Sequence, residues 1–317
     1  MHLMLTHSRV RRARPIRRRA GFTMAETLVV LVLLAIVGGS LMRVLTSQQR
    51  FYNGTGDLIA LRTQLRQAEA VIGNDLRGIS SVGSSGVGSD ISAMTDSSID
   101  FRYTIGVSVV CKTPVATTII IPPTDTLTKG NTLTSWIGKP TFGDTVFVFD
   151  EGASATSPTD DSWRAYKVIS LTPGVGACDA GFNAPSASTL ITDNAASVTI
   201  LDGAPMRYVR HAHYSLYQSP PVTGLWYLGY CSGDCGSGVS PIAGPFQSYQ
   251  ASTSPDTSGI RITYFDSTGA VTATPAQVAR IKIVLRGETK SYLNVTGMTR
   301  GVYHDSLSMN IALRNRS

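Results

Sequence analysis

The sequence predicts an α+β protein in which one long N-terminal helix, membrane-spanning and then amphipathic, packs on an antiparallel β-sheet domain. Three observations lead to this fold class. An apolar run of membrane length follows a cluster of arginines near the N-terminus. Apolar residues then recur at spacings of three and four, the period of one helix face. From residue 97 onward, short segments of alternating apolar and polar residues are separated by turn residues, which is typical of strands.

The apolar run extends from Phe22 to Met42. At about 1.5 Å per residue, its 21 residues reach roughly 30 Å, the thickness of a bilayer's hydrocarbon core. Glu26 is its only charged side chain, and a charge within a membrane span is costly enough that it usually has a partner. Arginines at positions 9, 11, 12, 14 and 17 to 19 precede Glu26 without any acidic residue. The positive-inside rule therefore places the N-terminus in the cytoplasm and the bulk of the chain outside.

Two ordinary targeting signals fit this pattern less well. The segment 38–43 lacks a clear Ala-x-Ala site, which argues against a cleaved secretory signal. An uncleaved signal anchor accounts for the arginines and the apolar run. It does not account for the Gly21-Phe22 pair or for Glu26.

Gly21, Phe22 and Glu26, set between a basic leader and a continuous apolar helix, resemble the class III signal of type IV pilins and type II secretion pseudopilins. The resemblance implies a pilin-like fold. It implies that a prepilin peptidase cleaves between Gly21 and Phe22 and methylates the new amine of Phe22. It also implies that Glu26 meets the N-terminal amine of a neighbouring subunit in a filament. Met24 and Ala25 stand where larger aliphatic residues are common in the family, and a leader of 21 residues is long.

Four domains follow from this interpretation: a leader at 1–21, a helix at 22–78 that spans the membrane to about residue 42, a Ser/Gly linker at 79–96, and an extracytoplasmic β-rich domain at 97–317. The helix face consists of Leu58, Leu61, Leu65, Ala68 and Ile72. The glycines in 38–39 and 53–56 are expected to kink or loosen the helix, because each costs about 1 kcal/mol relative to Ala.

Loss of the leader changes the charge balance. The chain has 28 Lys and Arg against 21 Asp and Glu, but seven of the arginines and none of the acids lie in 1–21, which leaves 21 of each. The basic isoelectric point of the whole chain is therefore no reason to expect nucleic-acid binding. After cleavage 296 of the 317 residues remain, which is enough for a substantial β-rich core.

The strand candidates lie at 99–103, 107–111, 117–121, 144–149, 165–171, 198–201, 207–217, 225–230, 260–265, 279–285 and 307–313. Asp266 to Gly269 is predicted to form a hairpin turn with glycine at the position of positive φ. Stretches rich in Ser, Pro and Gly at 152–160, 173–188 and 231–258 are predicted to be surface excursions.

Four cysteines, Cys111, Cys178, Cys231 and Cys235, lie on the side predicted to be exported, where disulfides persist. Three pairings are possible. Proximity favours Cys231 with Cys235, which leaves Cys111 with Cys178. A zinc site is the alternative, but Cys231 and Cys235 are separated by three residues and no second such pair accompanies them.

The sequence offers no convincing catalytic site, so we expect a protein that is not an enzyme and has no cofactor or metal. Gly83 to Gly86 lacks the spacing of a nucleophile elbow. His211 and His213 share one face of a predicted strand, but spacing identifies no third metal ligand for them. Acidic residues that could bind calcium, at Asp144, Asp150, Asp160 and Asp161, lack the spacing of an EF-hand.

Segments at 143–148, 163–168, 225–228, 260–266 and 308–316 resemble the layout of large minor pilins of the PilW type, and the J-type pseudopilin is similar. The resemblance implies a non-abundant subunit that primes or caps a type IV pilus. The alternative is the tip of a type II secretion pseudopilus. A signal-anchored extracytoplasmic enzyme or binding protein is the less favoured third hypothesis. The implied partners are the prepilin peptidase/methyltransferase and other pilins, with the inner membrane as the location before assembly and a periplasmic or cell-surface filament afterwards.

Overall fold

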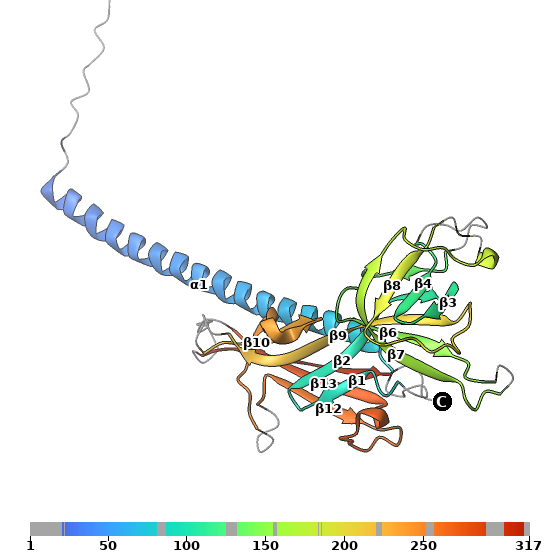
Figure 1. Ribbon diagram of the computed structural model, residues 1–317. Coiled ribbons are helices and arrows are strands. Elements are labelled where there is room, and N and C mark those ends of the chain that lie inside the picture. The colour runs from blue at the N-terminus through green and yellow to red at the C-terminus, as the bar shows by residue number, and fades with distance from the viewer. Residues whose placement is uncertain are drawn as a thin grey trace, which may run out of the picture. The chain divides into compact units, whose positions relative to one another are not determined.

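The computed structural model describes residues 21, 23–80, 87–124, 132–154, 157–182, 184, 186–219, 224–251, 257–289 and 301–313. The chain forms two compact units, 1–53 and 54–317. It combines one long helix with an antiparallel sheet, which confirms the predicted α+β class (Figure 1).

The helix α1 extends from Met24 to Arg77, close to the predicted range of 22–78. The expectation that glycines interrupt it is wrong, because the helix continues without a break through Gly38, Gly39, Gly54 and Gly56. A cost of about 1 kcal/mol per glycine is small for a helix of this length, which is otherwise rich in Leu, Ala, Gln and Arg.

The described strands are β1 (Ile91–Met94), β2 (Ser98–Val109), β3 (Lys112–Val115), β4 (Thr118–Ile121), β5 (Ser135–Trp136), β6 (Thr145–Asp150), β7 (Ser162–Thr172), β8 (Ser188–Thr192), β9 (Pro205–Gln218), β10 (Trp226–Ser232), β11 (Ser240–Phe246), β12 (Ile260–Phe265), β13 (Arg280–Glu288) and β14 (His304–Ala312). Short 3₁₀ helices lie at Ala180–Phe182, Cys235–Ser237 and Pro275–Gln277. The strands join in the order β12-β13-β11-β10-β9-β6-β7-β8-β4-β3, while β1, β5 and β14 attach through β2 and β13.

Two hydrophobic cores divide the unit 54–317 into two lobes. The first lobe buries residues of α1, β1 and β10 to β14. The second lobe buries residues of β4, β6, β7 and β8. The long paired strands β2 and β9 contribute to both cores, with Phe101 and Tyr214 in the first and Ile105 and Tyr208 in the second. Figure 1 shows β2 and β9 side by side between the two groups of strands.

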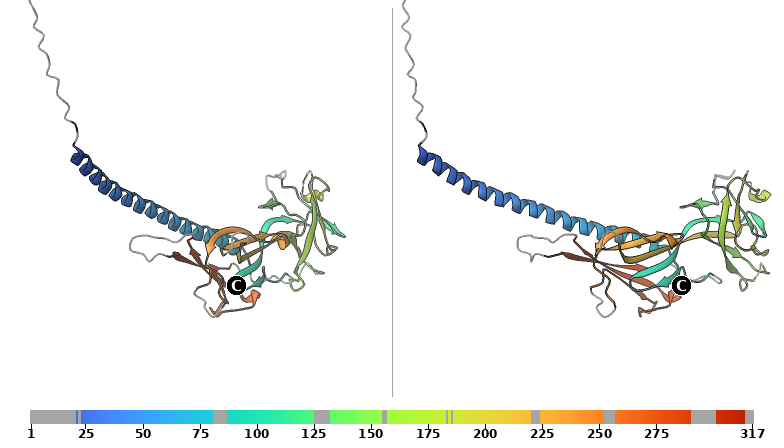
Figure 2. Two further views of the ribbon diagram at one scale, coloured as in Figure 1. Left: turned by 90° about the vertical axis from the view of Figure 1, so that its left-hand side faces the viewer. Right: turned by 60° about the vertical axis from the view of Figure 1, so that its left-hand side comes forward.

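The C-terminal part of α1 packs on the first lobe, as both views of Figure 2 show. Leu61, Leu65, Ala68 and Ile72 are buried, which confirms four of the five predicted face positions, and Leu76 is buried as well. The fifth position, Leu58, is only half-buried. The helix thus gains its stability here from burying an apolar face rather than from propensity alone.

The contact between helix and sheet is close at Gly287 of β13. A β-carbon at this position would lie 2.4 Å from Leu61 Cδ1 and 3.4 Å from Leu65 Cδ2. Glycine therefore gives the helix room to approach the strand, since any side chain would have to displace Leu61.

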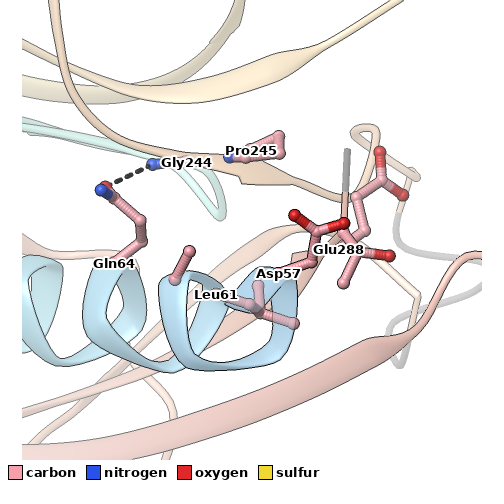
Figure 3. Close-up of a pocket in the computed structure, with 8 residues that line it drawn as sticks. Asp57, Leu61, Gln64, Gly244, Pro245 and Glu288 are labelled. Atoms are coloured by element: carbon pink, nitrogen blue, oxygen red, sulfur yellow. Dashed lines mark hydrogen bonds between the residues drawn. The ribbon is translucent and has the colours of Figure 1, made fainter. Parts of the chain in front are cut away.

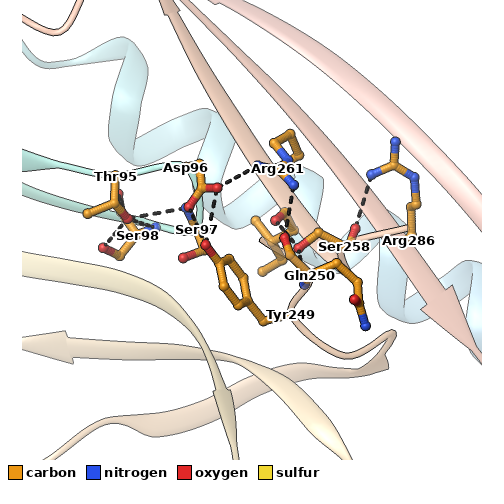
Figure 4. Close-up of polar contacts among 10 residues, drawn as sticks. Thr95, Asp96, Ser97, Ser98, Tyr249, Gln250, Ser258, Arg261 and Arg286 are labelled. Atoms are coloured by element: carbon orange, nitrogen blue, oxygen red, sulfur yellow. Dashed lines mark hydrogen bonds and ion pairs between the residues drawn. The ribbon is translucent and has the colours of Figure 1, made fainter. Parts of the chain in front are cut away.

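Polar contacts fasten the segment that follows β11 to the first lobe (Figure 4). Arg261 forms an ion pair with Asp96 and donates through Nη2 to the carbonyl of Gln250 at 3.0 Å. The Tyr249 hydroxyl also donates to Asp96, at 3.2 Å. The charged side chain of Asp96 is thereby shared between two residues of distant sequence, which fixes the loop against the sheet.

The predicted linker at 79–96 is shorter in the structure, and this expectation needs correction. Ile79 is fully buried, and Ile91 begins strand β1, which pairs with β2. Asp90 closes the segment, because its Oδ2 accepts a hydrogen bond from Ser80 N at 2.9 Å and its backbone N donates to Ser80 O at 2.8 Å. The residues 81–86, which hold most of the Ser/Gly run, lie outside the described residues.

Two other expectations about strands are also wrong. The segment 231–258 is not all surface excursion, because it contains β11, whose Pro241 and Pro245 hide the strand signal. Prolines fit in β11 because this strand pairs with β13 at Phe246 alone. Most of the β11 edge that faces β13 therefore needs no backbone N–H donor. The segment 198–201 is not a strand, since its backbone forms turns such as that from Ile200 N to Ser197 O.

The hairpin turn predicted at Asp266 to Gly269 is confirmed. Gly269 has a φ of 87°, and Asp266 Oδ1 accepts hydrogen bonds from Thr268 N at 2.8 Å and Ala270 N at 3.0 Å. These bonds, above all that from the Thr268 hydroxyl, hold the pKa of Asp266 below its usual value.

Candidate functional site

The N-terminal segment places the predicted cleavage point directly before the helix. Gly21 is exposed and lies outside α1, which begins at Met24. Phe22, the residue expected to carry the new amine, lies outside the described residues. Gly21 and Thr23, the described residues on either side of it, are both outside the helix.

Glu26 and Thr23 form a capping box at the start of α1. Glu26 Oε2 accepts from the Thr23 backbone N at 3.2 Å and from its hydroxyl at 3.3 Å, while the Thr23 hydroxyl accepts from Glu26 N at 3.3 Å. This reciprocal arrangement satisfies backbone donors that the first turn of a helix leaves free. The carboxylate also lies in the first turn of α1, at the positive end of the helix dipole.

Sequence reasoning missed Thr23, although the Thr-x-x-Glu signature of a capping box was available in Thr23-Met24-Ala25-Glu26. The capping box changes the interpretation of Glu26. In the isolated chain its carboxylate already has a local partner through Oε2. Its other oxygen, Oε1, has no hydrogen-bond partner among the described residues.

The first part of α1 exposes a continuous apolar surface. Leu28, Leu31, Leu34 and Ile36 are all more than 60% exposed. Among the described residues α1 is the one helix that is long and apolar enough to cross a membrane, and none of its apolar window is buried within the protein. Such a surface needs an apolar environment that the described part of the chain does not supply.

Polar contacts complement the apolar packing of the last part of α1. Tyr214 of β9 donates to Asp75 Oδ2 at 2.6 Å, and Arg62 Nε lies 3.0 Å from Asp305 Oδ2 of β14. Burial of the hydroxyl is the main cause that raises the pKa of Tyr214, and its hydrogen bond to the Asp75 carboxylate is the second. The phenol is therefore a permanent donor that connects the helix to the sheet.

A cavity of about 200 Å³ borders α1 on the same lobe (Figure 3). Gln64 Oε1 accepts from Gly244 N at 3.3 Å on one side, and Asp57 and Glu288 lie on the other. Burial raises the pKa of Glu288, which His304 partly opposes. This cavity is a polar recess beside the contact between helix and sheet, and His304, the residue opposite Glu288 on β14, is the basic neighbour of its acidic side.

Two disulfides bond the four cysteines in the pairing that the sequence favours. Cys111 is bonded to Cys178 across 67 residues and Cys231 to Cys235 across four. The first connects the end of β2 to the segment before β8, and the second closes the turn after β10. With all four sulfurs in disulfides, no thiolate is available as a zinc ligand.

The histidines and acids considered as metal ligands have other partners. Asp100 Oδ1 lies 2.9 Å from His213 Nδ1 and 3.2 Å from His211 Nε2, so one carboxylate joins both rings. Asp144 forms an ion pair with Arg210 and Asp150 with Arg164. In the part of the chain that the structure describes, no group of three His, Cys, Asp or Glu is arranged to hold a metal ion.

Asp160 stabilises the loop between β6 and β7. Its Oδ2 accepts from Ser154 N at 3.0 Å. Asp150 is fully buried, and burial alone would raise its pKa, but hydrogen bonds from Thr199, Gly152 and Arg164 outweigh this and hold the pKa below its usual value. These acids therefore order their own loops.

Residues 16–42 match the family model of the prokaryotic N-terminal methylation motif. The match covers Gly21, the predicted cleavage point, and Glu26. Followed by the long apolar helix, this class III signal is consistent with a type IV pilin-like protein, either a pilin or a pseudopilin. The motif and the helix together fit membrane anchoring, processing by a prepilin peptidase and assembly with other pilins. Searches of curated proteins and of solved structures found no match.

Proposed function

We propose that the protein is a minor pilin, a structural subunit that helps to prime or cap a type IV pilus after leader cleavage and N-methylation of Phe22. The observation that carries this proposal is the methylation motif at 16–42, which leads directly into an exposed apolar helix capped by Glu26. On this account the protein is cleaved and methylated by an enzyme and performs no catalysis itself.

The size of the unit at 54–317 supports a minor rather than a repeating subunit. A main pilin must pack against many copies of itself, and a second lobe adds bulk that each copy would have to accommodate. A subunit at the end of a filament meets no such restriction on its exposed side. The second lobe is accordingly free to present its own surface.

Glu26 has two roles on this account, one for each carboxylate oxygen. Oε2 caps the helix through Thr23 in the isolated chain. Oε1 remains to accept the methylated amine of a neighbouring subunit. A carboxylate in an apolar layer is costly unless it is paired, so the gain from meeting a cationic amine favours the assembled state over the separate subunit in the membrane.

The experiment compares Glu26→Ala with Thr23→Ala in cells that make the filament. Both changes remove the capping box, but only Glu26→Ala removes the carboxylate. We expect both proteins to lose their leader, because cleavage depends on Gly21. Thr23→Ala should enter sheared filaments and Glu26→Ala should not, as measured by immunoblot of the filament fraction.

Equal loss of incorporation in the two variants would contradict the pairing of Glu26 with a neighbouring amine. Helix capping would then be the one role left for Glu26. The phenotype of a strain that lacks the gene distinguishes a role in the pilus from a role in type II secretion. The proposal predicts fewer surface pili with protein export intact. Loss of export with normal pili would identify a J-type pseudopilin instead.

A further inference from the structure

A second cavity, of about 470 Å³, opens where the two lobes meet. Its walls come from four segments: Thr141–Asp144 before β6, Lys167 of β7, Arg210 and His211 of β9, and Ser232–Asp234 at the end of β10. The volume lies in the range of sites that hold small molecules. None of these residues belongs to α1, so the cavity is separate from the elements that the filament role uses.

One wall of the cavity is held in place by a two-pronged ion pair. Arg210 Nε donates to Asp144 Oδ1 at 2.8 Å and its Nη2 to Oδ2 at 2.7 Å. The same Nη2 donates to the Lys139 carbonyl and to the Thr141 hydroxyl. Asp144 Oδ2 in turn accepts from Thr141 N at 2.8 Å. The loop before β6 is thus ordered without a ligand, which lowers the entropic cost of binding one.

The opposite wall is fixed by the Cys231–Cys235 disulfide. Gly233 N donates to the His211 carbonyl at 2.8 Å, and Asp234 Oδ1 accepts from Gly236 N at 3.0 Å. The Ser232 hydroxyl lies 3.0 Å from the Tyr103 hydroxyl. Both walls are therefore formed in advance, as precise recognition requires.

The charges in the cavity nearly cancel. Arg210 neutralises Asp144, and His211 contacts Asp100 outside the cavity. The charged groups left for a ligand are the cation of Lys167 and the anion of Asp234, which have opposite signs and have no ion-pair partner among the described residues. An anionic ligand would meet Asp234, a cationic one would meet Lys167, and a wholly apolar one would leave both without a polar partner.

Phe142 adds an aromatic face to this polar cavity. Its side chain is 78% exposed, although the loop that carries it is firmly held. A ligand that suits the whole cavity is uncharged, offers groups that both donate and accept hydrogen bonds, and has an apolar face of its own. Hydroxyl groups do both, and a hexopyranose ring adds a face of C–H groups that can cover an aromatic ring.

We propose that this cavity is a carbohydrate-binding site, with the sugar ring against Phe142 and its hydroxyls between Lys167 and Asp234. The test uses the full mature chain in a detergent without a sugar headgroup. Saturation-transfer NMR titrations are made with the methyl pyranosides of glucose, galactose, mannose and N-acetylglucosamine. At least one of the four should bind in the millimolar range.

Two variants and two matched controls locate the site. Phe142→Ala and Lys167→Met should each weaken binding by about fivefold or more, as expected for loss of an aromatic contact or a charged donor. Ile137→Ala removes an exposed apolar side chain and Lys139→Met an exposed lysine, both in the segment before β6. Neither residue lines the cavity, so both changes should leave binding unchanged. Unaltered circular dichroism of all four variants shows that they are folded.

Three results would overturn the proposal: no binding of any of the four glycosides, binding that Phe142→Ala and Lys167→Met both leave intact, or equal loss in the control variants. Binding of acetate or methylammonium in place of the glycosides would also overturn it, since the cavity would then select charge. Because all measurements concern purified protein, their outcome is independent of whether the chain enters a filament.

Discussion

The two disulfides should contribute very unequally to stability, because they close loops of very different length. In the chain-entropy account, a cross-link removes freedom from the unfolded chain in proportion to the logarithm of the loop it closes. The separations of 67 and four residues correspond to about 4 and about 2 kcal/mol. Removal of the Cys111–Cys178 bond should therefore cost roughly twice as much free energy of unfolding as removal of Cys231–Cys235.

The comparison uses two double variants, Cys111→Ala/Cys178→Ala and Cys231→Ala/Cys235→Ala, in the mature chain. Urea unfolding is followed by tryptophan fluorescence, since Trp136, Trp163 and Trp226 all lie in the unit 54–317 and report on its unfolding. The long-loop variant should also become sensitive to proteases at 173–187, which Cys178 ties to β2. An equal or greater loss of stability in the short-loop variant would refute the reasoning from loop entropy.

Two further predictions concern the same unit. Leu65→Ala should destabilise it by about 2–5 kcal/mol, because Leu65 is 3% exposed between α1 and the sheet, whereas Leu31→Ala, at a site 64% exposed, should leave the urea midpoint unchanged. The pKa of Asp150 is lowered in the folded protein. Its contribution to the free energy of unfolding is therefore complete above the usual carboxyl pKa of about 3.9, and it is lost as the pH falls through the pKa of the folded state. Asp150→Asn should flatten the decline of the urea midpoint between about pH 5 and pH 3, and an unchanged decline would show that other carboxylates govern it.

The sequence could predict the helix and its buried face because both depend on local periodicity. Leu61, Leu65, Ala68 and Ile72 recur at helical spacing, and that pattern alone specifies which side faces the sheet. The expectation that glycines interrupt the helix fails because helix propensity contributes only weakly to helix stability. The surrounding residues of α1 override it.

Strands with mixed signals were harder to predict. β11 contains two prolines and a glycine, which favour a loop, and its place beside β10 is decided by pairing across the sheet. β1 has only four residues and lies next to a Ser/Gly run, so nothing local distinguishes it from a linker. Both strands depend on partners that are remote in sequence, which local patterns do not reveal.

The candidate site divides in the same way. Gly21, Phe22 and Glu26 follow from a short motif, and the motif match at 16–42 covers them. The capping role of Thr23 is also local and could have been predicted. The cavity beside Phe142 could not, since it joins Lys167, Arg210 and Asp234 from separate strands and turns.

The central claim is that this chain is processed as a prepilin and built into a filament through its new N-terminus. Mass spectrometry of the protein recovered from sheared filaments tests this most directly. The account predicts an N-terminal peptide that begins at Phe22 and carries one additional methyl group on its amine. A chain that retains Met1, or one cut after Ser40, would contradict it.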